Sequence, residues 1–336
     1  MTTDTLTLVR RRFTLVALVL PAVVILAAVV AQVLLLPAVP AVVATHWGWT
    51  GAPDGFAPAW TVPLVTAILG LGLSATLFGA SVGGLRRGDH GFAYRLLGAV
   101  AFGLAVLIGG LGVATLGIQV GRADADAALP VLLLPGVLLA AAAAGWIGWA
   151  VQPHVPWRPT PTMPAAEVPV RAGERVVWMQ GVTLARGGAV VLWIAFAIGC
   201  LAVLPVVFFG DLVTAIISGL VVVVLFVVVA TTLRFHVRVD PDGLTAVSAA
   251  GWPRVHVPTQ DIVSAEVVQV SPFGEFGGWG IRWPGGGRQG VVLRAGEGLL
   301  VRRSDGRTLT VTVDDAATAA GLLSAYAALT PARRGD

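Results

Sequence analysis

The sequence predicts an α-helical integral membrane protein with six transmembrane helices, followed by a small all-β barrel or sandwich closed by one α-helix. Hydrophobic residues make up 56% of the 336 residues and charged residues only 12%, whereas soluble globular proteins carry about 25% charged residues. The mean hydropathy is +0.85. Six long uncharged runs fill most of the chain up to residue 233, and the residues after it alternate in the manner of strands. So few charges cannot cover a water-facing surface, which excludes an ordinary soluble enzyme.

Each of the six runs is long enough to cross a bilayer, which takes roughly 20 helical residues. None contains Asp, Glu, Arg or His. The runs are 13–36, 61–82, 96–119, 130–151, 188–209 and 212–233. Backbone polar groups in lipid must be paired within the segment, so we expect helices. Only Gly210 and Asp211 separate the last two runs, which therefore predict a tight antiparallel hairpin.

The arginines predict the orientation. If the N-terminus is cytoplasmic, twelve arginines flank the helices on the cytoplasmic side, and only Arg122 lies on the other side. This bias follows the positive-inside rule. We therefore expect a multi-pass protein of the plasma (inner) membrane with both termini in the cytoplasm. All 22 basic residues are arginine, a composition typical of GC-rich, actinobacterial-like bacterial genomes. They are spread over loops, so no nucleic-acid partner is expected.

These patterns divide the chain into four predicted parts. Residues 1–151 form a four-helix membrane domain, 152–187 a cytoplasmic linker, 188–233 a transmembrane helix hairpin, and 234–330 a cytoplasmic domain. Six prolines favour an extended linker. Its stretch 173–178 is expected to be a short strand or an interfacial segment.

Short alternating segments separated by turn signals predict the strands of the last part. They are 234–239, 244–248, 254–257, 262–270, 290–294, 299–303 and 308–313. The glycine-rich stretch 277–287 is expected to be a long hairpin loop. A helix is expected to begin after Asp314 or Asp315 and to run to about Leu329. It would close one open end of the barrel or sandwich.

Three motifs of this part carry a resemblance to a known family. They are Asp-Pro-Asp-Gly-Leu at 240–244, Pro-Thr-Gln-Asp-Ile at 258–262 and Phe-Gly-Gly-Trp-Gly-Ile-Arg at 276–282. In this strand order they resemble the bacterial pleckstrin-homology-like (PH-like) domains attached to membrane helices. The resemblance covers nearly all of 234–330. It implies a PH-like small barrel closed by one helix, with a surface that binds a protein or lipid partner.

A second motif lies in the predicted outer loop between the first two helices. Its candidate residues are His46, Trp47, Gly51, Pro53, Asp54, Gly55 and Phe56. The pattern is similar to the His-aromatic-x-x-x-Gly-x-Pro-Asp-Gly-aromatic loop of the DUF1648 family, over about residues 13–85. The family's domain also occurs in SdpI-like membrane proteins, where it is coupled to immunity and signal sensing. We expect His46 to pair with Asp54, either as a pH-sensitive element or as part of a packed loop whose polar groups satisfy one another.

The tail offers a candidate interaction surface. Its residues are Trp279, Arg282, Arg288, Arg294, Arg302 and Arg303. Arginines at a membrane surface contribute about 1 kcal/mol each toward anionic headgroups. The alternative is a mixed, solvated surface, because eleven arginines and ten acidic residues follow residue 233.

Catalytic motifs are missing from the sequence. It has no His-Glu-x-x-His, no Gly-x-Ser-x-Gly and no phosphate-binding loop, so we expect no catalytic, cofactor-binding or metal-ligating residues. Ion-coupled transporters usually need ionisable residues inside their helices. Here Gln32 and Gln119 are the most polar residues of the runs, and the sequence suggests no partner for either.

The sequence therefore predicts a non-enzymatic membrane protein, an envelope sensor or scaffold. Its tail would bind a cytoplasmic protein partner or anionic lipid headgroups. A small-solute permease or channel, and a structural subunit of a membrane complex, are the alternatives.

Overall fold

The computed structural model describes residues 3–157, 161–165, 168–171, 174–209 and 212–329. The chain divides into two compact units. The helical unit contains Met1–Gly88, Tyr94–His154 and Val191–Phe226, and the β unit contains Asp89–Ala93, Val155–Val190 and Val227–Asp336. Three segments of the chain therefore belong to each unit.

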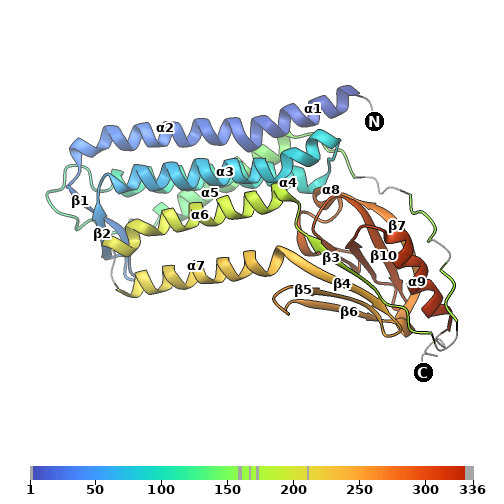
Figure 1. The fold of residues 1–336 in the computed structure, drawn as a ribbon. Helices are drawn as coiled ribbons and strands as arrows, with labels where there is room; N and C mark the ends of the chain where they lie inside the picture. The colour runs from blue at the N-terminus through green and yellow to red at the C-terminus, as the bar shows by residue number, and fades with distance from the viewer. Residues whose placement is uncertain (1–2, 158–160, 166–167, 172–173, 210–211, 330–336) are drawn as a thin grey trace. The chain divides into compact units, whose positions relative to one another are not determined.

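Six described helical segments are long and apolar enough to cross a membrane, as predicted. The first is nearly continuous through α1 (Thr3–Thr14), a π-helical turn (Leu15–Val19), α2 (Leu20–Leu35) and a 3₁₀ turn (Leu36–Ala38). The others are α3 (Thr61–Arg87), α4 (Phe92–Gly117), α5 (Leu133–Val151), α6 (Arg186–Phe209) and α7 (Leu212–Thr232) (Figure 1). The predicted turn at Gly210 and Asp211 lies outside the described residues.

Small residues allow the first helices to approach closely, as is common between membrane helices. A Cβ on Gly70 of α3 would lie 2.2 Å from Cδ1 of Ile25 on α2, and a Cβ on Gly109 of α4 would lie 3.0 Å from Cβ of Ala28. Ile25 is fully buried. Its side chain therefore fills the space between α2, α3 and α4.

The β unit holds two separate sheets. The antiparallel four-stranded sheet has the order β3-β4-β5-β6, and the five-stranded sheet has the order β7-β10-β11-β9-β8, with β11 and β9 parallel. The first sheet contains β3 (Trp178–Thr183), β4 (Arg234–Asp240), β5 (Gly243–Ser248) and β6 (Arg254–Pro258). The second contains β7 (Ile262–Val270), β8 (Gly280–Gly285), β9 (Arg288–Val292), β10 (Gly296–Arg303) and β11 (Thr308–Thr312). The short helix α8 (Pro272–Glu275) follows β7, and α9 (Ala316–Leu329) packs on β7 and β10.

The small closed barrel predicted for 234–330 is not confirmed, because the described strands form two sheets and no closed barrel. Residue 330 itself lies outside the described residues. Part of the predicted glycine loop is strand β8, which pairs with β9 through a turn at Gly286 and Gly287. Both glycines have positive φ angles, of 61° and 72°, which glycine adopts at low steric cost. The final helix is present and buries Ala319, Leu322 and Leu323 against the sheets.

Strand β3 connects the region predicted as a linker to the β unit. It pairs with β4 along its whole length, from Trp178 opposite Val239 to Thr183 opposite Arg234. The amide of Leu184 then donates to the carbonyl of Leu233 at 2.8 Å. Helices α6 and α7 are therefore inserted between two neighbouring, paired strands, in the position of a hairpin turn.

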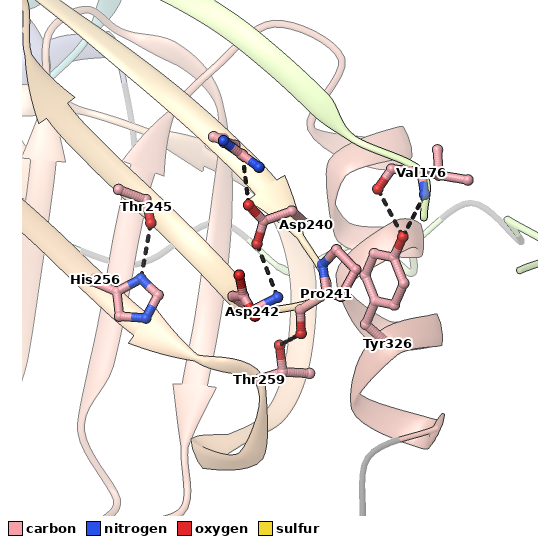
Figure 2. A network of polar contacts seen from close by, with 9 residues as sticks. Val176, Asp240, Pro241, Asp242, Thr245, His256, Thr259 and Tyr326 are labelled. Atoms are coloured by element: carbon pink, nitrogen blue, oxygen red, sulfur yellow. Dashed lines mark hydrogen bonds and ion pairs between the residues drawn. The ribbon is translucent and has the colours of Figure 1, made fainter. Parts of the chain in front are cut away.

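The side chain of Tyr326 holds the segment that leads into β3 (Figure 2). The hydroxyl of Tyr326, on α9, accepts from the backbone N–H of Val176 at 2.8 Å and donates to its carbonyl at 2.7 Å. Tyr326 is only 4% exposed.

Tyr326→Phe should therefore lower the free energy of unfolding of the β unit by about 1–3 kcal/mol, because two hydrogen bonds are lost while the ring still packs. Chemical unfolding, together with hydrogen exchange at Val176, measures the effect. Unchanged stability with unchanged exchange at Val176 would show that this contact does not hold the segment.

Candidate functional site

A short β-hairpin joins α2 to α3 at one end of the helical unit (Figure 1). Strand β1 (Val42–Trp47) pairs antiparallel with β2 (Pro53–Pro58), with Ala44 opposite Phe56 and His46 opposite Gly55. The turn is closed by the amide of Gly48, which donates to the carbonyl of Ala52 at 3.0 Å. All seven residues of the sequence motif lie in this hairpin or its turn.

The expected pair of His46 and Asp54 is formed across the two strands. Nδ1 of His46 lies 2.5 Å from Oδ1 of Asp54, and the two side chains are 59% and 50% exposed. A Cβ on Gly48 would lie 2.9 Å from Oδ2 of Asp54, and one on Gly55 would lie 2.8 Å from Cβ of His46. Glycine at both positions therefore leaves room for the pair. Such exposed pairs contribute about 0–1 kcal/mol, so the pair does not by itself fix the hairpin.

Buried hydrogen bonds hold the hairpin to α4 instead. Gln119, just beyond α4, accepts from the amide of Ala44 at 2.7 Å and donates to the carbonyl of the same residue at 3.0 Å. It also donates to the carbonyl of Thr115 at 2.7 Å, and both Gln119 and Ala44 are fully buried. Gln119 therefore has the partners that the sequence did not suggest.

The connection between α4 and α5 is attached to the hairpin by two further bonds. Nε1 of Trp47 donates to the carbonyl of Ala127 at 2.7 Å. The amide of Leu129 donates to the carbonyl of Gly51 at 2.9 Å. Two of the motif residues thus position the loop, and they do not line the cavity described next.

A cavity of about 350 Å³ lies beneath the hairpin. Helices α3 and α4 form most of its wall, the hairpin contributes one side, and α6 and α7 contribute one residue each. The lining residues are Thr45, His46, Gly55, Phe56, Ala57, Thr61, Val62, Val65, Thr66, Leu69, Ile108, Leu111, Gly112, Thr115, Ala202 and Thr214. A concave, mainly apolar space of this size with a few polar groups is typical of small-molecule sites.

A buried amide lies behind one wall of this cavity. Gln32 of α2 is fully buried, and its Oε1 accepts from the hydroxyl of Thr66 at 3.1 Å. Its Nε2 has no hydrogen-bond partner among the described residues. A Cβ on Gly112 would lie 2.5 Å from that nitrogen. The amide therefore packs against two residues, Thr66 and Gly112, that line the cavity.

The candidate residues of the tail do not form a free basic face. Arg288 lies 3.7 Å from Glu275, Arg302 lies 3.0 Å from Glu266, Arg303 lies 3.4 Å from Asp305, and Arg294 pairs with Asp314. Arg282 donates to the carbonyl of Trp279 at 2.6 Å. The Trp279 ring packs edge-on against Phe273, with centroids 4.9 Å apart. Four of these arginines are thus paired with acidic side chains, so basic and acidic groups are interspersed at these positions.

A different face of the β unit carries basic residues that were not among the sites predicted from the sequence. On β4 these are Arg234, His236 and Arg238, and on β6 they are Arg254 and His256. The register places Arg238 opposite Thr245, and Thr245 opposite His256. Thr245 and His256 are hydrogen-bonded at 2.8 Å (Figure 2), and Arg238 pairs with Asp240 at 2.5 Å. The sequence contained a signal for this face: the basic residues stand at every second position of each strand, and residues i and i+2 of a strand lie on the same face.

A buried acidic group lies elsewhere in the β unit. Nε1 of Trp157 donates to Glu275 at 3.2 Å, and the Glu275 side chain is 9% exposed. Burial raises the pKa of Glu275 above its ordinary value of 4.5, an effect larger than the lowering by Trp157 and Arg288. The pKa of Glu266 is lowered, chiefly by its hydrogen bond to Arg302.

Because the pKa of Glu275 is raised and that of Glu266 is lowered, the two side chains should make the stability of the β unit depend on pH in opposite directions. The contribution of Glu275 to stability is fully present below pH 4.5 and is lost as the pH rises through its raised pKa. Glu275→Gln stays neutral and can still accept from Trp157, so it should remove this loss and gain stability relative to the wild type between acidic and neutral pH.

Glu266→Gln serves as the matched control, because the Glu266 contribution is present at neutral pH and is lost as the pH falls through its lowered pKa. This variant should lose stability relative to the wild type at neutral pH. Thermal unfolding from pH 4 to pH 7 measures both. Parallel curves for Glu275→Gln and the wild type would contradict the prediction.

The six apolar helices indicate a multi-pass membrane protein. Within it, residues 23–71 match the model of the family described as "Domain of unknown function (DUF1648)". This confirms the predicted resemblance for those residues, which include Gln32, the whole β1–β2 hairpin and the α3 residues Thr61, Val62, Val65, Thr66 and Leu69 that line the cavity. No curated protein and no solved structure matches the chain.

Proposed function

We propose that the protein is a non-enzymatic membrane sensor, with the cavity beneath the β1–β2 hairpin as its input and the β unit as its output. The observation that carries this proposal is the path of α6 and α7. Ala202 of α6 and Thr214 of α7 line the cavity. The same two helices join β3 and β4, which are paired where the helices leave them. A change in the cavity that displaces α6 against α7 would therefore act on the ends of two paired strands.

The proposed sensor has a defined orientation in the membrane and a cytoplasmic binding partner. The hairpin end faces outward across the plasma (inner) membrane, both termini are cytoplasmic, and the β unit binds a cytoplasmic protein or anionic headgroups. The positive-inside distribution of arginines supports this orientation. The resemblance of 234–330 to PH-like domains supports a binding module.

Packing beyond the cavity favours a sensor over the alternative of a permease. Ile25 fills the space beside Gly70, one turn along α3 from Thr66. Further along α3, the hydroxyls of Ser74 and Ser81 donate to carbonyls of their own helix. These hydroxyls are therefore satisfied within α3, as expected for a bundle that is closed beyond the cavity.

Cysteine accessibility tests the proposal in proteoliposomes. In a Cys200→Ser background, which removes the native thiol, Thr66→Cys should react with a membrane-impermeant thiol reagent added on the hairpin side. Ser81→Cys, buried on the same helix, should not react from that side. Similar reaction rates at both positions would indicate a water-filled path through the bundle and would overturn the sensor in favour of a permease.

A further inference from the structure

We infer that the cavity beneath the hairpin binds a small, mainly apolar molecule that carries one hydroxyl or carbonyl oxygen. The inference rests on the proposed function, since it names the ligand class of the proposed input site. Three features of the cavity point to this ligand class: its size, the apolar character of its wall, and the buried Gln32 amide nitrogen that has no acceptor.

The volume limits the size of the ligand. An engineered apolar cavity of about 150 Å³ holds benzene, which has six non-hydrogen atoms. The cavity beneath the hairpin measures about 350 Å³. In proportion, it accommodates a molecule of about 14 non-hydrogen atoms.

The wall limits the polarity of the ligand. Its apolar side chains include Phe56, Leu69, Ile108 and Leu111, and the described lining contains no Asp, Glu, Lys or Arg. The ionisable group that it does contain, His46, lies in the hairpin and is paired with Asp54. A charged ligand would lose its hydration without gaining a partner of opposite charge, which is unfavourable. An uncharged, apolar body suits this wall.

Gln32 specifies the polar atom of the ligand. The hydroxyls of two lining residues already donate within the protein, Thr61 to the carbonyl of Pro58 at 2.7 Å and Thr66 to Gln32 at 3.1 Å. Nε2 of Gln32 still lacks an acceptor, and a buried donor without an acceptor is destabilising. Because the amide packs on Thr66 and Gly112, which line the cavity, a ligand oxygen at this wall would supply the missing acceptor. A Cβ at Gly112 would come within 2.4 Å of Oγ1 of Thr66, so glycine keeps the amide against the wall.

Photolabelling of the full chain in lipid nanodiscs tests the ligand class. The probe is an eight-carbon alcohol that carries a diazirine, and labelled residues are found by mass spectrometry. The alcohol should label cavity residues such as Leu69 and Leu111 saturably. Unlabelled 1-octanol should compete about fivefold better than octane, the factor expected for one net hydrogen bond. Gln32→Leu should abolish this preference for the alcohol.

Two further variants address the place of binding. Val65→Phe fills the cavity and should reduce labelling at least about fivefold, since the added ring occupies the ligand's volume. Leu64→Phe is the matched control, because Leu64 is the neighbouring residue on α3 and is 43% exposed. It should leave labelling unchanged.

Three results would overturn the inference: labelling that does not saturate, equal competition by octane and 1-octanol in the wild type, or labelling that is insensitive to Val65→Phe. The alkane comparison needs no variant, so it remains decisive if Gln32→Leu fails to fold. Failure of the sensor is a separate outcome. In that case the alcohol still binds, but its binding leaves the ends of β3 and β4 unchanged.

Discussion

Gln119→Leu is expected to lower the free energy of unfolding of the helical unit by about 2–6 kcal/mol. Gln119 pairs with both backbone polar groups of Ala44, and both residues are fully buried. Leucine has a similar volume but can neither donate nor accept. The substitution therefore leaves the N–H and the C=O of Ala44 without partners, and each unsatisfied buried group costs about 1–3 kcal/mol.

In Gln119→Leu, the β1–β2 hairpin should lose its stability first. Hydrogen exchange of β1 should accelerate before the rest of the helical unit opens, and unfolding in detergent measures the total effect. Arg122→Ala is the control, because its ion pair with Asp126 is exposed and contributes about 0–1 kcal/mol. Equal stability of Gln119→Leu and Arg122→Ala would contradict the assignment of Gln119 as the residue that holds the hairpin.

Gly243→Ala is expected to destabilise the β unit by about 3 kcal/mol or more. Gly243 begins β5 with φ = 127°, a conformation that residues with a side chain rarely adopt. A Cβ there would lie 2.1 Å from the carbonyl oxygen of Val257 on the neighbouring strand β6. Backbone strain and overpacking each cost about 1–3 kcal/mol. Because the clash is with backbone, relief requires β5 and β6 to separate.

Gly306→Ala is the control that separates the cost of backbone strain from the cost of the steric clash. Gly306 also has a positive φ, of 79°, but a Cβ there would meet nothing within 4 Å. This variant should therefore cost about 1 kcal/mol. Chemical unfolding of the two variants side by side measures the difference. A loss for Gly243→Ala no larger than that for Gly306→Ala would show that the backbone contact with β6 does not constrain the turn.

The helical part of the fold could be predicted because its physical signal is local. A run of about 20 uncharged residues satisfies the bilayer constraint by itself, and α6 (Arg186–Phe209) begins within two residues of the predicted start at 188. The sheets depend on pairing between distant segments. Nothing in 178–183 indicates that this strand pairs with β4, which follows it in the chain only after α6 and α7. The same dependence explains why the sequence could not decide between the predicted barrel and the predicted sandwich, and why a closed barrel is not confirmed.

The candidate site could be predicted only in part, for a related reason. The hairpin motif is contiguous, so His46 and Asp54 could be paired from the sequence, and they are paired. The cavity and the amide behind its wall bring together segments far apart in the chain. Of Gln32, Thr66 and Gly112, the sequence therefore singled out only the glutamine, by its polarity. In the tail, sequence counting could show that arginines and acids were balanced. Only the structure shows which arginine pairs with which acid.

In the proposed sensor, a change inside the cavity alters the β3–β4 pair through helices α6 and α7. Hydrogen exchange in nanodiscs tests this coupling most directly. Val65→Phe places a ring in the cavity, and Leu64→Phe places one outside it on the same helix. The readout is the exchange of the amides of Leu184, whose bond to Leu233 closes the β3–β4 pair, and of Phe235 on β4. We expect Val65→Phe to change the exchange of these amides severalfold and Leu64→Phe to leave it at the wild-type rate. Identical exchange in both variants and the wild type would contradict the account.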